Sequence, residues 1–278
     1  YFVKNHFTKD KMILIQDNSN ILYAFNTNGK LIWKKKLNNK IIGKINSIDF
    51  YKNNKYQCIF NTNTNLHIID RNGNYVENYP IKLPNKTKIG HSLFDYNNKK
   101  KYRIMIVGED NMIYNLDKKG KKVIGWKYKK QNNRILKSPK HFKFNTNDYI
   151  LLETRNKTTK LLAINGTERI IFSSESIFND SEIKVGENGY LYAITNDAKL
   201  WKATLDGNST ETILPNLSNE SKFTVINNNF IFNNDKKVYS IDEEFNNLFT
   251  LNFDNEIKHI SNYKDYILIE TSNKLFLY

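Results

Sequence analysis

The sequence contains few of the residues that cross-link small folds through disulfides or form cysteine-based metal sites. Among 278 residues there is one cysteine, Cys58, so neither an intrachain disulfide nor a cysteine-based metal site is possible. We expect Cys58 to be a small buried hydrophobic residue in a strand. Only four prolines and eleven glycines are present, which excludes a low-complexity linker. No apolar run approaches the roughly 20 residues of a membrane-spanning helix, so we expect no transmembrane segment.

Catalytic motifs are missing as well. The chain has no P-loop, no Gly-x-Ser-x-Gly sequence and no pair of cysteines. The sequence therefore predicts a protein that is not an enzyme and has neither catalytic residues nor a bound cofactor or metal ion.

The residues that are abundant favour β-structure. Aromatic residues make up 13% of the chain, and broad rings pack well on a pleated, half-buried surface. Short apolar runs alternate with turns rich in Asn, Asp, Lys and Gly, and no stretch sustains a 3.6-residue period. We expect almost no helix.

The apolar runs form a repeat of about 35 to 50 residues, the period of four-stranded propeller blades. The second strand of each unit is the clearest part. These runs are Met12–Ile15, Tyr56–Phe60, Arg103–Val107, Tyr149–Leu152, Tyr190–Ala193, Phe230–Phe232 and Tyr266–Ile269. They predict an all-β, seven-bladed β-propeller of four-stranded antiparallel blades; six or eight blades remain open.

The third and fourth strands repeat too. Leu22–Trp33, His67–Val76 and Ile113–Trp126 each show a strand, an Asn or Asp, two polar residues, a Gly and a further strand. This pattern is typical of a tight hairpin, because Gly accepts a positive φ and Asn or Asp bonds the turn backbone.

The chain ends suggest how the repeat begins and closes. Tyr1–Phe7 fits the first strand of unit one, and the last unit lacks a fourth strand, which would come from before Tyr1 or after Tyr278. We expect residues 1–278 to form a single propeller domain. Because the chain opens without Met, we expect it to be part of a longer one.

The strand-turn-strand unit resembles the PQQ-like β-propeller repeat, and Leu22–Trp33 is the best copy in this chain. This resemblance implies that Trp33 and Trp126 pack between blades. Family members include quinone-dependent dehydrogenases and non-enzymatic scaffolds of bacterial outer-membrane assembly. Units two and three also look like repeat proteins of Bacteroidetes-type cell envelopes. A vicinal disulfide accompanies the quinone in the dehydrogenases, and one cysteine cannot form it.

Two kinds of metal site have partial support in the sequence. Asp49 and Asp95 stand where integrin-like blades hold calcium, but Asn and Lys surround them, so we expect them to cap turns. Five histidines could supply a channel metal site, and four of them fall near first strands. The histidines do not stand at equivalent positions relative to the second strands of their units. We therefore expect polar or partly buried histidines that bind no metal ion. They are His6, His67, His91, His141 and His259.

Charge is divided unevenly along the chain. The net charge is +15, yet residues 1–139 carry 28 Lys and Arg against 9 Asp and Glu, whereas residues 140–278 carry 15 against 19. A field of one sign steers anionic partners. The candidate partner-binding residues are Lys34, Lys35, Lys36, Lys99, Lys100, Lys101, Lys118, Lys119, Lys121, Lys122, Lys129 and Lys130.

The sequence thus predicts a non-catalytic scaffold for protein–protein interactions in a bacterial cell-envelope complex, periplasmic or surface-associated. Two alternatives remain open. One is a channel-mouth enzyme or carbohydrate-binding propeller. The other is a binder of anionic surfaces, whether lipid headgroups or nucleic acid, through units one to three; few Arg residues and no recognition motif count against nucleic acid.

Overall fold

The computed structural model describes residues 1–4, 11–130, 132–155, 158–173 and 178–278. Within these ranges the chain contains β-strands, turns and bends and no helix, as the sequence predicts. No helix in this part of the chain could therefore cross a membrane.

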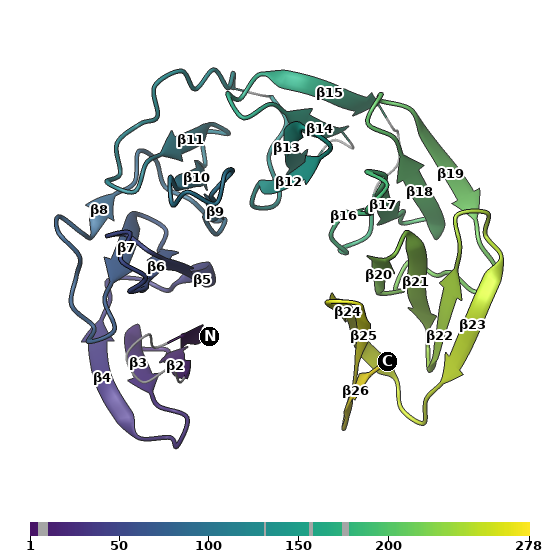
Figure 1. Cartoon of the computed structure of the whole chain (residues 1–278), viewed down its shortest axis with the longest axis horizontal. Coiled ribbons are helices and arrows are strands. Elements are labelled where there is room, and N and C mark those ends of the chain that lie inside the picture. Colours follow the sequence, from purple (N-terminus) through teal and green to yellow (C-terminus); the bar gives the residue numbers. More distant parts are fainter. Residues whose placement is uncertain (5–10, 131, 156–157, 174–177) are drawn as a thin grey trace. The chain divides into compact units, whose positions relative to one another are not determined.

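The described strands form seven antiparallel sheets of consecutive strands, which we number in chain order (Figure 1). Sheet 1 contains β1 (Phe2–Lys4), β2 (Lys11–Gln16), β3 (Ile21–Phe25) and β4 (Leu31–Lys36). Sheet 2 contains β5 (Ile42–Ile48), β6 (Gln57–Asn61), β7 (Asn65–Ile69) and β8 (Ile81–Lys82). Sheet 3 contains β9 (Ser92–Phe94), β10 (Arg103–Val107) and β11 (Ile113–Leu116).

The remaining sheets follow the same order. Sheet 4 contains β12 (Lys140–Phe144), β13 (Asn147–Glu153), β14 (Thr158–Leu162) and β15 (Glu168–Ser173). Sheet 5 contains β16 (Lys184–Val185), β17 (Leu191–Ile194), β18 (Lys199–Ala203) and β19 (Ser209–Ile213). Sheet 6 contains β20 (Phe223–Ile226), β21 (Asn229–Asn234), β22 (Lys237–Ile241) and β23 (Asn247–Asn252). Sheet 7 contains β24 (Ile257–Tyr263), β25 (Tyr266–Thr271) and β26 (Leu275–Leu277).

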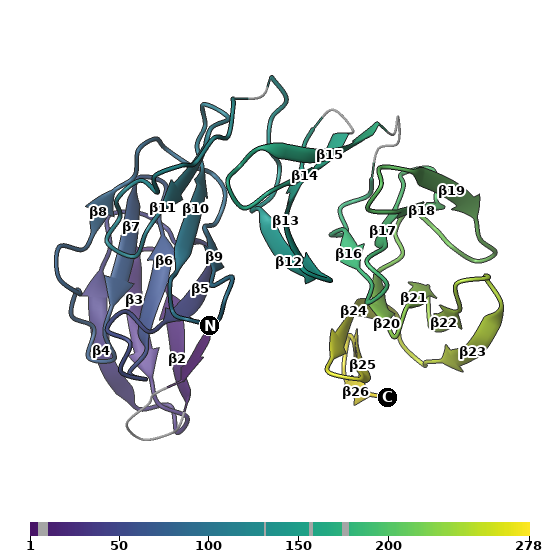
Figure 2. The ribbon, with the colours of Figure 1, turned by 45° about the horizontal axis from the view of Figure 1, so that its top comes forward.

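The chain divides into two compact units. The first unit comprises 1–141, 150–155 and 162–168, and the second comprises 142–149, 156–161 and 169–278. Figure 2 shows the consecutive strands of the individual sheets from a second direction.

Each predicted second strand overlaps the second strand of a sheet, and β1 is the first strand of sheet 1 as expected. The second strands of the internal sheets 2 and 5 are buried on both faces: all five residues of β6 and all four of β17 are buried. In β2 and β25 the buried residues alternate with more exposed ones. One apolar cluster draws Phe50 from sheet 2 and Ile106 from sheet 3. Another draws Tyr192 from sheet 5 and Phe230 from sheet 6. The core therefore lies between consecutive sheets.

The predicted position of the fourth strand is wrong in sheets 2 and 3. After the hairpin turn only Tyr75 bridges Ile69, and β8 begins later, at Ile81. In sheet 3 no fourth strand is described: Trp126 N–H donates to the Val123 carbonyl in a turn, 3.4 Å apart, with Gly125 at a φ of +84°. The chain bends away at this point because that backbone conformation does not continue a strand. Sheet 7 has three described strands, as expected.

The two expected inter-blade tryptophans each contact the hairpin glycine of the following sheet. Trp33 Nε1 donates to the Arg71 carbonyl at 2.7 Å, and a Cβ on Gly73 would lie 2.8 Å from the Trp33 ring. Trp126 covers Gly166 in the same way, at 3.0 Å. Glycine at these turns therefore lets the ring approach the backbone of the next sheet.

Replacing Gly73 by alanine should lower the free energy of unfolding by about 2 kcal/mol, because its φ is +82° and a methyl group would overlap the Trp33 ring. Gly29→Ala is the matched control. Gly29 also has a positive φ, +77°, but no atom lies within 4 Å of the position that a methyl carbon would take there. Denaturant unfolding should show the smaller loss for Gly29→Ala; equal losses would contradict the packing role of Trp33.

A basic surface and a cavity on the first three sheets

Most of the candidate lysines lie near the ends of the first three sheets. In each antiparallel sheet, the first-to-second and third-to-fourth turns lie at one end, which we call the first end. The second-to-third turn and the link to the next sheet lie at the opposite, second end. Lys99–Lys101 and Lys118–Lys122 fall at the first end of sheet 3, Lys34–Lys36 in β4, and Lys129–Lys130 in the link after sheet 3.

Lys100 is part of an ion pair inside the protein. Its Nζ lies 2.5 Å from Asp49 Oδ2 and 2.6 Å from Asn54 Oδ1. The side chain of Asp49 is fully buried, and its two oxygens also accept the backbone N–H groups of Asn53 and Asn54 at 3.0 and 2.9 Å. The lysine ammonium thus supplies the positive charge that a metal ion would supply in a calcium loop.

These contacts determine the direction in which the pKa of Asp49 is shifted. Burial raises the pKa of Asp49, but the hydrogen bond from Lys100 and those from the Asn54 and Asn53 amides outweigh burial, so the pKa lies below its ordinary value. Asp95, at the same place in sheet 3, accepts the amides of Lys100 and Lys101 at 2.7 and 3.2 Å. Both aspartates cap turns, as the sequence predicts. Among the described residues, no group of three His, Cys, Asp or Glu side chains is placed to hold a metal ion.

Three more of the candidate lysines have internal contacts. Lys118 Nζ donates to the Phe50 carbonyl and lies 4.9 Å from the centre of the Phe50 ring. Lys35 Nζ lies 4.3 Å from the centre of the Tyr75 ring, and Lys36 donates to the Ser19 carbonyl. These lysines join neighbouring sheets or turns, which reduces their availability to a partner.

Several exposed lysines lie at the first ends of sheets 2 and 3, while others, such as Lys44 in β5 and Lys82 in β8, lie elsewhere on these sheets. We call the surface at these first ends the basic end: Lys52, Lys55, Lys99, Lys101, Lys119 and Lys121. Asp117 at this end is half-buried and accepts the amides of Lys119 and Lys121 at 2.8 and 3.0 Å. Lys52 and Lys55 are not among the lysines predicted from the sequence, because they are isolated there and join the others only through the contact of sheets 2 and 3.

The four histidines that the structure describes do not form one site. His67 lies in the third strand of sheet 2, where its ring stacks on Phe60 and its Nδ1 lies 3.1 Å from the Tyr75 hydroxyl. His91 Nδ1 lies 3.2 Å from Asn61 Oδ1. Burial lowers the pKa of His67 and of His91 to about 4, and the Lys35 charge adds to the shift at His67. His141 and His259 belong to the first strands β12 and β24, and His6 lies outside the described residues.

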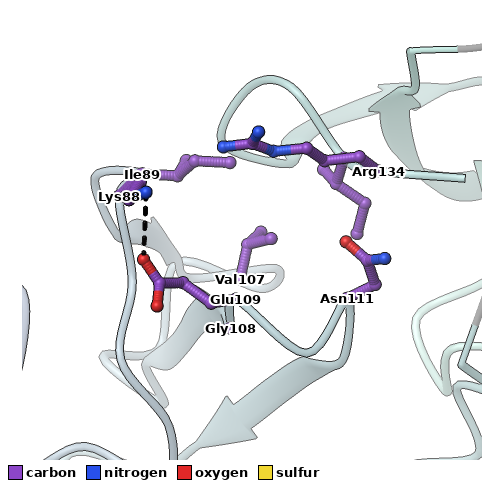
Figure 3. Close-up of a pocket in the computed structure, with 8 residues that line it drawn as sticks. Lys88, Ile89, Val107, Gly108, Glu109, Asn111 and Arg134 are labelled. Carbon is purple, nitrogen blue, oxygen red and sulfur yellow. Dashed lines mark ion pairs between the residues drawn. The ribbon is translucent and has the colours of Figure 1, made fainter.

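A cavity opens at the second end of sheet 3, in the first compact unit (Figure 3). Its volume is about 270 Å³. Val107 and Ile135 are buried in its wall, whereas the charged lining residues are exposed. The lining residues are Lys88, Ile89, Val107, Gly108, Glu109, Asn111, Arg134 and Ile135. No motif marks the cavity in the sequence, because three separate segments form it.

No family model matches the sequence, and no curated protein matches it. Solved structures match the fold at low identity. The structure of BBS1N in complex with ARL6DN gives a TM-score of 0.65 at 10% identity, over 100% of this chain and 89% of that one. BamB from Moraxella catarrhalis gives 0.54 at 12% identity, over 96% and 92%. The fold is a β-propeller.

The propeller fold by itself does not decide the activity. A catalytically inactive variant of virginiamycin B lyase from Staphylococcus aureus, solved with quinupristin, is also similar, with a TM-score of 0.51 at 12% identity over 99% of this chain and 96% of that one. Binding proteins and enzymes therefore share this architecture, and the function must be argued from the surfaces of this propeller.

Proposed function

We propose that this propeller is a non-catalytic scaffold that binds an acidic protein partner through the basic end of sheets 2 and 3. The observation that carries the proposal is the arrangement of charge at that end: the lysines are exposed, while Asp49 is fully buried against Lys100 and Asp117 is half-buried and accepts backbone amides. The ammonium groups therefore dominate the field that an approaching partner meets.

A scaffold needs a surface that holds its shape, and the basic end has one. Tyr102 of sheet 3 accepts the Asp49 amide at 3.1 Å, and the Tyr79 hydroxyl donates to the Lys118 carbonyl at 2.8 Å. Together with the Lys100 ion pair, these bonds fix the turns of the two sheets to one another. A preformed surface binds with less loss of conformational entropy.

The finer assignment is also a proposal. We infer that the propeller is of the PQQ-like type, which is supported by the packing of Trp33 and Trp126 on the turn glycines Gly73 and Gly166. A place in a bacterial cell envelope, periplasmic or surface-associated, rests on that resemblance.

Affinity purification from the cells that produce the protein tests the scaffold. The wild-type propeller should retain an acidic protein partner, and the double variant Lys119→Glu/Lys121→Glu should lose at least 90% of it, because two charges reverse at the basic end. Lys236→Glu/Lys237→Glu is the matched control, since both lysines are exposed neighbours in the second unit.

The outcome separates the proposal from its alternatives. Loss of the partner in the first variant and retention in the control support the scaffold. A wild-type protein that emerges alone, or that carries only lipid or nucleic acid released by salt, would contradict it.

A further inference from the structure

We propose that the cavity at the second end of sheet 3 is a socket for one acidic side chain, Glu or Asp, of a protein partner. This inference rests on the proposed function, because it assumes a protein partner, but it uses a different surface. Figure 3 shows Arg134 extending over the cavity toward Ile89, with Val107 beneath.

The charges at the rim favour a carboxylate. Lys88 and Glu109 form an ion pair at 3.5 Å, which leaves the negative charge of Glu109 compensated. The Arg134 guanidinium has no carboxylate partner among the described residues. A guanidinium can hold a carboxylate through two parallel hydrogen bonds, so Arg134 is the group that a Glu or Asp would meet.

Size and lining together favour a side chain over a larger ligand. The volume of about 270 Å³ lies below the roughly 300–1,000 Å³ of pockets for drug-sized molecules. Buried Val107 and Ile135 provide an apolar wall for methylene groups below the charged rim. One side chain with a short apolar stem and a terminal carboxylate fits both features.

The three segments that form the cavity are each held by backbone hydrogen bonds. Glu109 N–H donates to the Lys86 carbonyl at 2.8 Å, and Gly108 N–H donates to the Met112 carbonyl at 2.9 Å. Arg155 N–H donates to the Arg134 carbonyl at 2.8 Å, while Ile135 bridges Thr154 of sheet 4. The socket therefore exists before a ligand arrives, which lowers the entropic cost of binding.

Methyl NMR of the whole chain tests the socket with N-acetyl-glutamate methylamide as the probe and its glutamine analogue as the uncharged counterpart. We expect the glutamate probe to shift the methyl signals of Ile89, Val107 and Ile135, with a Kd on the order of 1 mM. The glutamine analogue should bind at least tenfold more weakly. Arg134→Gln should weaken binding of the glutamate probe by a similar factor, whereas Lys236→Gln, which changes an exposed lysine of the second unit, should leave that binding unchanged.

Several results would overturn the socket. They are equal binding of the two probes, unchanged binding to Arg134→Gln, or cavity methyl signals that do not move. Inorganic phosphate is tested as a competing ligand. Tighter binding of phosphate than of the glutamate probe would assign the cavity to a free anion instead.

The scaffold and the socket can fail separately. If Arg134→Gln keeps the purified partner while Lys119→Glu/Lys121→Glu loses it, and the glutamate probe does not bind, the socket is wrong and the scaffold stands. If no partner is purified but the glutamate probe binds, the scaffold is wrong.

Discussion

Replacing Asp49 by alanine is expected to lower the free energy of unfolding by about 3 kcal/mol at neutral pH. The fully buried carboxylate accepts two backbone amides and pairs with Lys100 across two sheets. Its loss removes all of these bonds and leaves the Lys100 ammonium without its countercharge, bonded only to Asn54 Oδ1 among the contacts described above. Denaturant unfolding of the purified chain measures the change.

Asp95→Ala is the matched control for this prediction. Asp95 caps the equivalent turn of sheet 3 through two amides, but it is only half-buried. Its loss should cost about 1 kcal/mol, the usual value of a side-chain cap. Equal losses in the two variants would show that the ion pair of Asp49 contributes nothing beyond a cap.

The loss of stability caused by Asp49→Ala should also depend on pH. Since the pKa of Asp49 is lowered from 3.8 in the folded protein, its contribution is complete above that value and declines as the pH falls through the folded pKa. The difference between wild type and Asp49→Ala should therefore shrink in acid. A difference that grows in acid would contradict the assignment.

Mild acid is expected to destabilise the protein through His67 and His91, by about 4 kcal/mol in total between pH 7.5 and 5.0. Both pKa values are lowered to about 4 by burial, from 6.5 in the unfolded chain. The unfolded state therefore takes up protons in this range and the folded state does not. The contribution of the two neutral histidines to the free energy of unfolding is fully present above pH 6.5 and is lost as the pH falls toward 4.

The surroundings of the two rings explain why they stay neutral. His91 Nδ1 faces Asn61 Oδ1, and its Nε2 is a buried atom with no hydrogen-bond partner among the described residues. A proton added there would create an unsatisfied buried charge. Around His67, the stacked Phe60 ring and the nearby Lys35 charge also oppose protonation.

The variants His67→Gln and His91→Gln check the histidine prediction. Each should be less stable than wild type at pH 7.5, because packing and hydrogen bonds change, but each should lose less on acidification by about 2 kcal/mol. The informative quantity is thus the change between the two pH values, obtained from denaturant unfolding. An unchanged pH dependence in the double variant would contradict the prediction.

The sequence predicted the central strands well because each is a short, mainly apolar run. Tyr56–Phe60 and Arg103–Val107 must be buried on both faces, and their spacing marks the repeat. The fourth strand of sheet 3 was predicted wrongly because Val123–Trp126 has the composition of a strand. Its path depends on the conformation of Gly125 and the packing of the Trp126 ring, which local sequence does not encode.

The site could be predicted only in part. A run of lysines shows that positive charge is present, but not which ammonium groups face solvent. Lys100 and Asp49 are 51 residues apart, and Lys118 and Phe50 are 68 apart, so their contacts follow from the packing of sheet 3 on sheet 2. The cavity depends in the same way on three segments that meet only in the folded chain.

The position of the core between the sheets has a consequence for how the repeat tolerates change. Sheet 2 shares one apolar cluster with sheet 1 through Cys58 and another with sheet 3 through Ile59. Removing half of a repeat would expose hydrophobic surface on two neighbours at once, whereas removing a whole repeat could rejoin two similar surfaces. Evolution by duplication or loss of entire repeats is therefore the route that keeps every interior covered.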